Sequence, residues 1–211
     1  MMLTRSRSRY WLLLCLVMAI DANVANAAKP FCMYSLQNGW SDKGPFEYVT
    51  HRAGPNDRSG IPEVVKRIMQ ALRFRADFEV YIAEAENNAF AAVASGKKIL
   101  VVDVDFLESI NRQTRTDWGA IQVVAHEIGH HIAGFSRGSH ENELNADYWS
   151  GLALRRLGAA KGAATQAILA IGGDVDSPSH PNKHRRARMI ENGWDDDSRG
   201  RIDYTHCDGC R

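Results

Sequence analysis

The chain has little net charge, no internal repeat and, after its first 20 residues, no long hydrophobic run. A net charge of +1 in 211 residues gives no electrostatic reason to expect nucleic acid or an anionic membrane surface as a partner. No later segment approaches the roughly 20 apolar residues that a membrane-spanning helix needs. Hydrophobic residues make up 45% of the chain and charged residues 24%, as in globular proteins, so disorder is not expected. The length suits one folded domain with short appendages.

The first 27 residues have the three parts of a secretory signal peptide. Arg5, Arg7 and Arg9 form a basic start, residues 10–20 form an apolar stretch, and Ala25-Asn26-Ala27 is a small-x-small cleavage site. The alternative is a membrane anchor, but a helix of that length spans only about 16 Å, half of the hydrocarbon core. We therefore expect cleavage after Ala27 and a secreted or periplasmic protein that keeps no stable membrane span.

Three cysteines remain beyond the predicted cleavage site, namely Cys32, Cys207 and Cys210. In an oxidising compartment, one disulfide and one free thiol are expected, and Cys32 paired with either partner would join the chain ends. The spacing of Cys207 and Cys210, with His206 adjacent, is also that of half a zinc knuckle. The chain has no second half for such a site, so the disulfide is favoured.

The order of the predicted elements indicates an α+β domain, mainly helical, with a small sheet or hairpin beside the central helix. Residues 28–60 are punctuated by glycine and proline and form a loop-rich extension, residues 61–194 form the domain, and residues 195–211 form a polar tail. Helices are expected over residues 62–72, 105–111, 116–134, 141–157, 159–171 and 182–192, and strands over residues 78–83, 88–93 and 98–104. The last strand is continuously apolar, which predicts that both of its faces are covered.

The most informative stretch is His126-Glu127-Ile128-Gly129-His130, an H-E-x-x-H motif. Residues four apart share one face of a helix, so the two histidines can bind one metal ion, and we expect one zinc per chain. Glu127 is rotated away from that pair but can reach a water on the metal and accept its proton as general base. A chance match is the alternative. The flanking residues are apolar, however, and a glutamate buried between two histidines needs a cation as partner.

A third metal ligand is expected from the next helix. Glu143 is the preferred candidate, because Asp147 follows on the same helix face and can accept a hydrogen bond from a ligating histidine. His140 and Glu141, just upstream, are the competitors. His131 points about 100° away from His130 and is not expected to bind the metal.

Four short stretches, in this order, resemble the HtpX and CAAX-prenyl-protease family of gluzincin zinc metallopeptidases. The resemblance covers roughly residues 62–194 and implies a zincin-like fold and a short, soluble, secreted zinc endopeptidase. The stretches are Asn88-Ala89-Phe90-Ala91, His126-Glu127-Ile128-Gly129-His130, Glu143-Leu144-Asn145-Ala146-Asp147, and Ser179-His180-Pro181 with Arg185 and Arg188 following.

The resemblance also implies roles outside the metal ligands. Asn88, Ala89 and Phe90 would line the substrate cleft, where an edge strand can pair with an extended peptide; the alternative is an ordinary hairpin arm. His180 would approach the metal as an oxyanion donor or as an inhibitory fourth ligand; the alternative is a simple loop histidine.

The expected function is hydrolysis of peptide bonds in protein substrates, with unfolded envelope proteins as one candidate class. The principal alternative is a non-catalytic zinc-binding or chaperone-like envelope protein on the same scaffold. The intact Glu127 argues against it, because a binding protein needs no base. Hydrolysis of a non-peptide bond is a third reading, since a metal with a carboxylate is not peptide-specific chemistry.

Overall fold

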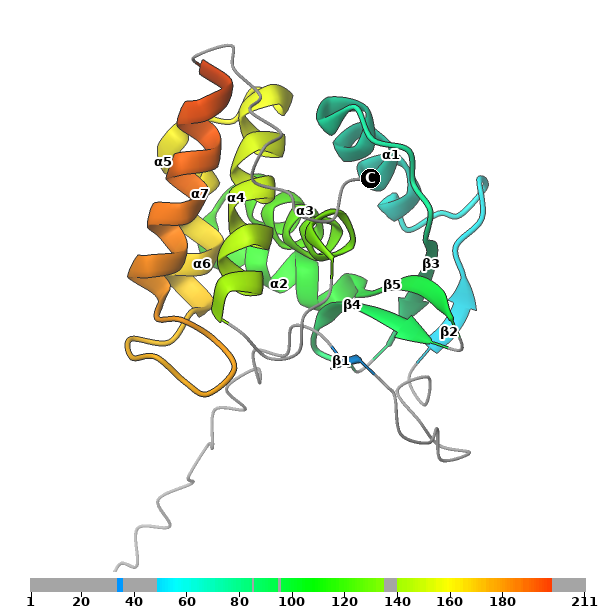
Figure 1. The fold of residues 1–211 in the computed structure, drawn as a ribbon. Coiled ribbons are helices and arrows are strands. Elements are labelled where there is room, and N and C mark those ends of the chain that lie inside the picture. The colour runs from blue at the N-terminus through cyan, green and yellow to red at the C-terminus, as the bar shows by residue number, and fades with distance from the viewer. Residues whose placement is uncertain (1–33, 36–48, 85, 95, 135–139, 199–211) are drawn as a thin grey trace, which may run out of the picture.

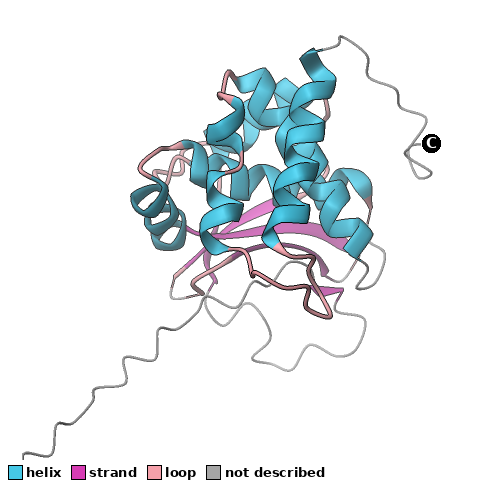
Figure 2. Ribbon diagram, turned by 90° about the vertical axis from the view of Figure 1, so that its left-hand side faces the viewer, coloured by secondary structure: helices cyan, strands magenta, loops and turns pink. Residues whose placement is uncertain are grey.

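The computed structural model describes residues 34–35, 49–84, 86–94, 96–134 and 140–198, which form an α+β fold (Figure 1). Figure 2 shows the helices gathered on one side of a small sheet. The helices are α1 (Ile61–Leu72), α2 (Val104–Thr114), α3 (Trp118–Ala133), α4 (His140–Leu157), α5 (Lys161–Ala164), α6 (Gln166–Ile171) and α7 (Lys183–Ser198). The strands are β1 (Tyr34–Ser35), β2 (Val49–Arg52), β3 (Glu79–Ala83), β4 (Ala89–Ala94) and β5 (Lys97–Asp103). The predicted signal peptide, all three candidate disulfide cysteines and residues 199–211 lie outside the described residues.

The sheet has the strand order β1-β4-β5-β3-β2. Strands β4 and β5 form the predicted antiparallel hairpin, in which Phe90 lies opposite Val101. Strand β3 runs parallel to β5, β2 runs antiparallel to β3, and the short β1 runs parallel to β4. Gly96 follows β4 with φ of 77°, a left-handed conformation that glycine adopts without strain.

Within residues 28–60, which were predicted to be loop-rich, Val49–Arg52 forms the strand β2, which was not predicted. Three of its four residues are exposed, so the segment has no apolar alternation that would mark it as a strand. It joins the sheet by backbone pairing with β3, which sequence periodicity does not report.

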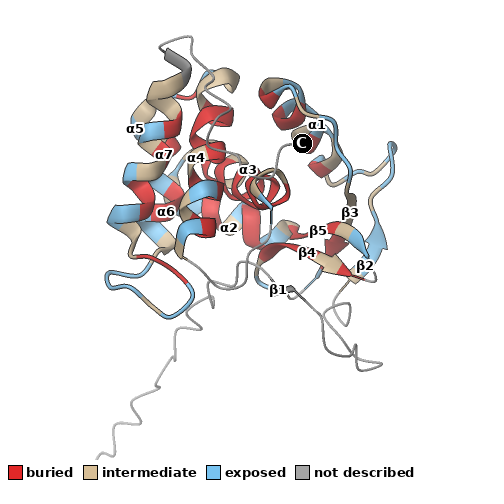
Figure 3. Ribbon diagram, in the orientation of Figure 1, coloured by how far each residue is buried: buried red, intermediate tan, exposed pale blue. Residues whose placement is uncertain are grey.

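The hydrophobic core lies between the helices and the sheet, and β5 contributes to both faces of the sheet, as predicted. Leu100 and Val102 pack in the large cluster with helices α1 to α4. Ile99 and Val101 pack with Phe90 in a smaller cluster on the other face. Figure 3 shows α3 buried over most of its length at the centre of the molecule.

Helix α3 begins where the side-chain oxygen of Thr116 accepts the backbone N–H of Trp118, at 3.3 Å. It ends at Gly134, whose φ of 84° stops the helix. Helix α4 ends in the same way at Gly158, with φ of 97°. The predicted ends of both helices are therefore confirmed, and the motif histidines lie in the buried second half of α3.

Three glycines allow the helices around the site to approach one another closely. A Cβ atom on Gly129 of α3 would lie 2.7 Å from the carbonyl oxygen of Ala146 in α4. A Cβ on Gly151 of α4 would overlap the backbone of Ile190, and one on Gly193 of α7 would overlap the backbone of Tyr148. At these glycines, the backbone of α4 therefore packs directly against the backbones of α3 and α7.

Helix α7 continues to Ser198, beyond the helix end predicted at residue 192 and into the segment that was predicted to be a polar tail. The two residues after Trp194 are polar, but both make polar contacts with other helices of the domain. Asp195 lies 2.7 Å from the Lys161 ammonium, and Asp196 accepts the Tyr148 hydroxyl at 2.9 Å. These contacts extend the helix into what composition alone suggested to be a tail.

No helix within the described part of the chain is both long enough and apolar enough to cross a membrane.

Candidate metal centre

The structure brings together His126 and His130 from α3 and Glu143 from α4. All three side chains are buried, and one nitrogen or carboxylate oxygen from each lies within 4.8 Å of the others. The four-residue spacing on one helix places the two imidazoles edge to face, with ring centroids 4.7 Å apart. This group could hold a metal ion.

The distances within the group fit a shared ion better than direct hydrogen bonds. Nε2 of His126 lies 3.4 Å from one oxygen of Glu143, and Nε2 of His130 lies 3.5 Å from the other. Good N–H···O bonds are about 2.7–3.2 Å long. Two ligand atoms at about 2.0–2.1 Å from a tetrahedral ion are separated by about 3.3 Å. The spacing therefore fits atoms arranged around a small cation.

The protonation states also fit metal binding. Burial alone would raise the pKa of Glu143, but the neighbouring His126, His130 and Arg186 lower it to about 2. Burial, together with the adjacent His126, lowers the pKa of His130 to about 3. At neutral pH the glutamate is therefore ionised and His130 is neutral, the forms in which both residues bind metals.

Asp147, one turn after Glu143, lies beneath the first histidine of the motif. Its Oδ1 is 2.8 Å from Nδ1 of His126, so it can fix the orientation of a ring whose Nε2 faces Glu143. Burial would raise the pKa of Asp147, but Arg186 and His126 lower it. This arrangement is the one predicted for Asp147.

Arg186 on α7 is a site residue that sequence reasoning missed. Its side chain is buried, with Nε 2.8 Å from Oδ2 of Asp147 and a terminal nitrogen 3.2 Å from Nε2 of His126. The two arginines singled out from the sequence lie elsewhere, since Arg185 pairs with Asp176 at 2.5 Å and Arg188 is exposed. A signal was present, because Arg186 lies four residues before the buried Ile190 and shares its helix face.

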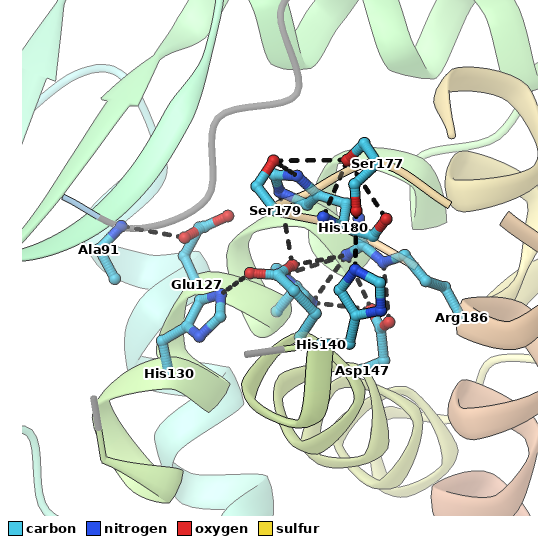
Figure 4. A network of polar contacts seen from close by, with 11 residues as sticks. Ala91, Glu127, His130, His140, Asp147, Ser177, Ser179, His180 and Arg186 are labelled. Carbon is cyan, nitrogen blue, oxygen red and sulfur yellow. Dashed lines mark hydrogen bonds and ion pairs between the residues drawn. The ribbon is translucent and has the colours of Figure 1, made fainter. Parts of the chain in front are cut away.

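Glu127 is buried but is not one of the three grouped ligands. Its Oε2 accepts the backbone N–H of Ala91 in β4, at 2.9 Å. Figure 4 shows the Glu127 carboxylate turned toward Ala91 and away from Asp147 and Arg186. The Glu127 carboxylate is thus held between α3 and β4, outside the group of three candidate ligands.

His180 enters the site from the loop between α6 and α7. Its Nε2 lies 3.6 Å from Oε2 of Glu143, and its Nδ1 lies 2.8 Å from the hydroxyl of Ser179 (Figure 4). The loop is tied to α4, because Nε2 of His140 is 2.7 Å from the carbonyl oxygen of Ser177. His180 therefore contacts the centre.

The competing ligand candidates lie outside the grouped ligands. His140 contacts the loop as described, and Glu141 is exposed. His131, as predicted, points away from the group: its Nε2 is 2.9 Å from the carbonyl oxygen of Ile99, and its ring stacks on Phe78.

The residues predicted to contact substrate do not share one face of the sheet. Ala89 packs in the large core cluster and Phe90 packs in the cluster on the opposite face. Asn88 is half-buried, and its carbonyl oxygen accepts the N–H of Asp103. The side chain of Phe90 therefore points away from Glu127, and the stretch contacts Glu127 through the backbone N–H of Ala91.

No protein-family model, curated protein or solved structure matches this chain.

Proposed function

We propose that the chain is a zinc-dependent endopeptidase with a zincin-like fold. The observation that carries the proposal is Glu127, a buried carboxylate next to the metal-binding group that is not itself part of that group. A site built only to bind metal would not need a second buried carboxylate beside its ligands, because burying a carboxylate is costly. A base beside a metal is what hydrolysis requires.

The donor set supports zinc as the metal. Two imidazole nitrogens and one carboxylate oxygen are common zinc ligands, and three protein ligands with an open position are typical of catalytic zinc sites. When bound there, zinc would lower the pKa of a water to about 7 and polarise a carbonyl group.

The residues of this chain then have distinct roles. His126, His130 and Glu143 would hold the ion, and Asp147 would orient His126. Glu127 would take a proton from the attacking water and return it to the leaving amine. The Ala91 N–H orients its carboxylate through Oε2.

Peptide bonds are the proposed substrate because of the strand beside Glu127. On the side of β4 away from β5, the sheet continues only with the two-residue strand β1 among the described residues. Strand β1 pairs with Ala92 and Val93 of β4. Among the described residues, no strand pairs with the outer edge of β4 before Ala92, so an extended polypeptide could pair there, beside Ala89 and Phe90, which would make recognition tolerant of sequence. With the predicted signal peptide, this points to protein substrates, such as unfolded envelope proteins, in the periplasm or outside the cell.

The test is Glu127→Gln, which keeps the size of the side chain and removes the proton acceptor. Zinc content measured on the purified protein should remain about one per chain. Cleavage of an unfolded protein substrate should fall by about 10²–10⁴. A chelator should abolish cleavage by the parent protein.

Two outcomes would reject this proposal. Cleavage by Glu127→Gln at the parent rate would exclude Glu127 as the base. A protein that binds zinc and cleaves no unfolded substrate, yet suppresses the aggregation of a client in both forms, would indicate the binding or chaperone-like alternative.

A further inference from the structure

Asp103 is a buried residue outside the metal centre, at the point where β5 ends and α2 begins. Its Oδ1 accepts the backbone N–H of Phe106 at 3.2 Å, which is the usual role of a residue that caps a helix. Its Oδ2 accepts a second backbone N–H, that of Asn87, at 2.9 Å. Capping α2 uses only one of these oxygens, so the second oxygen has a separate role.

The second bond holds a backbone conformation that most residues avoid. Asn87 has a φ of 57°, in the left-handed region, which asparagine enters more readily than most residues. The next residue is tied to the same place, because the carbonyl oxygen of Asn88 accepts the backbone N–H of Asp103 at 3.1 Å. Asp103 therefore binds both residues that lead into β4, one through its side chain and the other through its backbone.

Beyond this turn, the backbone of β4 faces alternately toward β5 and toward the outer edge of the sheet. Asn88 faces β5, where its carbonyl oxygen is bonded. Ala91, three residues on, faces the outer edge, since its N–H donates to Glu127 and not to β5. By the same alternation, the N–H and carbonyl groups of Ala89 face the outer edge. The backbone group that holds Glu127, and those that could pair with a substrate, therefore follow the turn within four residues.

We propose that Asp103 is a positioning residue for the candidate active site. By holding Asn87 in its left-handed conformation, it fixes the start of β4, and so the place where the Ala91 N–H meets Glu127 and where the outer edge meets a substrate. Strand β4 has only six residues, and its outer neighbour among the described residues is the two-residue β1, so few other contacts fix its start. The effect on catalysis rests on the proposed peptidase function, whereas the effect on β4 does not.

The test variant is Asp103→Ser, because serine caps helices well but has one side-chain oxygen in place of two. It should keep the bond to Phe106 and lose the bond to Asn87. A second variant changes the other partner: Asn87→Ala keeps Asp103 and disfavours the left-handed conformation. Its matched control is Asn87→Gly, which accepts that conformation without strain and should behave as the parent does. Asn87 is exposed, so both changes at this position should fold.

The first measurement is amide hydrogen exchange followed by NMR. In the parent, the N–H groups of Asn87, Ala91 and Phe106 should all be protected. In Asp103→Ser, exchange at Asn87 and Ala91 should be faster by about tenfold, the usual effect of one lost hydrogen bond, while Phe106 stays protected. Unchanged exchange at Ala91, with the Asn87 bond lost, would show that the bond acts only locally and would overturn the proposal.

The second measurement is the hydrolysis of an extended fluorogenic peptide by the zinc-loaded protein. A displaced strand should raise KM and a displaced Glu127 should lower kcat, so kcat/KM of Asp103→Ser should fall by about 10–100-fold. Zinc should stay at about one per chain, because its ligands come from α3 and α4. Ile68→Val, a change in the buried face of α1, controls for stability: it should destabilise the fold and keep the parent kinetics.

The two proposals fail in different ways. If the parent cleaves no peptide, yet exchange at Ala91 depends on Asp103, the peptidase proposal fails and the positioning of β4 by Asp103 stands. If the parent and Asp103→Ser cleave equally well, although the Asn87 bond is lost, only the inference about Asp103 fails. Equal kinetics in Asn87→Ala and Asn87→Gly would count against it in the same way.

Discussion

Arg186 on α7 binds both carboxylate oxygens of Asp147 on α4, with Nε 2.8 Å from Oδ2 and a terminal nitrogen 3.0 Å from Oδ1. Both side chains are buried, and Asp147 also lies 2.8 Å from Nδ1 of His126 on α3. Three helices therefore meet in one set of polar contacts below the candidate metal ligands. Planar two-point pairing of this kind is specific to arginine.

We expect Arg186→Met to lower the free energy of unfolding by about 3–5 kcal/mol, because it leaves a buried carboxylate without its cation. Zinc affinity should fall by about 10–100-fold, since His126 loses its supported orientation. Chemical denaturation and competition with a zinc chelator measure the two effects. The matched control is Arg185→Met, which breaks the exposed pair with Asp176 and should have little effect on stability. Equal losses in the two variants would refute a special role for Arg186.

Zinc binding should require Glu143 and tolerate loss of Glu141. The two carboxylates lie two residues apart, but Glu143 is buried among the histidines and Glu141 is exposed. Glu143→Ala should therefore abolish stoichiometric zinc, as should His126→Ala or His130→Ala, because two remaining ligands are too few. Metal analysis after dialysis gives the result. A larger loss of zinc in Glu141→Ala would mean that the helix register at the site is different.

Gly129 should not tolerate even the smallest side chain. A Cβ there would lie 2.8 Å from the Cα of Ala146, so Gly129→Ala must push α3 and α4 apart. We expect a loss of about 1–3 kcal/mol in stability and weaker zinc binding, because the ligands come from both helices. Gly162→Ala in α5 is the control, since nothing lies within 4 Å of its Cβ position. That change should be neutral or stabilise by up to about 1 kcal/mol. Thermal unfolding of both variants would show whether close helix packing is the cause.

Stability of the metal-free protein should depend on pH through His131. Burial lowers its pKa in the folded protein from 6.5 to about 4. Between these values the unfolded chain binds a proton that the folded chain does not, so the free energy of unfolding falls as the pH falls from about 6.5 to about 4. The contribution of His131 over this range is about 3 kcal/mol.

The test variant is His131→Gln, which keeps a donor for the carbonyl oxygen of Ile99 and cannot be protonated. Its stability should depend less on pH over that range than the parent's. His184→Gln changes an exposed histidine on α7 and should leave the pH dependence as it is. If the free energy of unfolding changed equally with pH in the parent and in His131→Gln, burial of His131 would not be the cause of the pH dependence.

Periodicity predicted the parts of the fold that are amphipathic or continuously apolar. It identified α3 and α4 with their glycine ends, and β5 with both faces covered, because these patterns follow directly from which faces are buried. The grouping of His126, His130 and Glu143 could be predicted because the spacing within each helix fixes which side chains share a face.

The features that could not be predicted depend on contacts between distant segments. Strand β2 is mostly exposed and is held by pairing with β3, so its own residues show no strand pattern. The end of α7 depends on Lys161 and Tyr148, which bind Asp195 and Asp196 from elsewhere in the chain. Arg186 is one of three arginines within four residues; its spacing from Ile190 favours it as the buried one, but only the packing of α7 on α4 shows that it pairs with Asp147.

The close contact of α4 with α7 has a consequence for how the metal centre can be lost. At Gly151 and Gly193 the two backbones touch, so the separation of the helices has a fixed minimum that no side-chain rearrangement can reduce. Any larger residue at either glycine would move Arg186 away from Asp147 while leaving every ligand and the whole H-E-x-x-H motif in the sequence. Two residues that never touch the metal centre therefore help to decide whether it forms, and a chain could keep the motif intact and still lose the site.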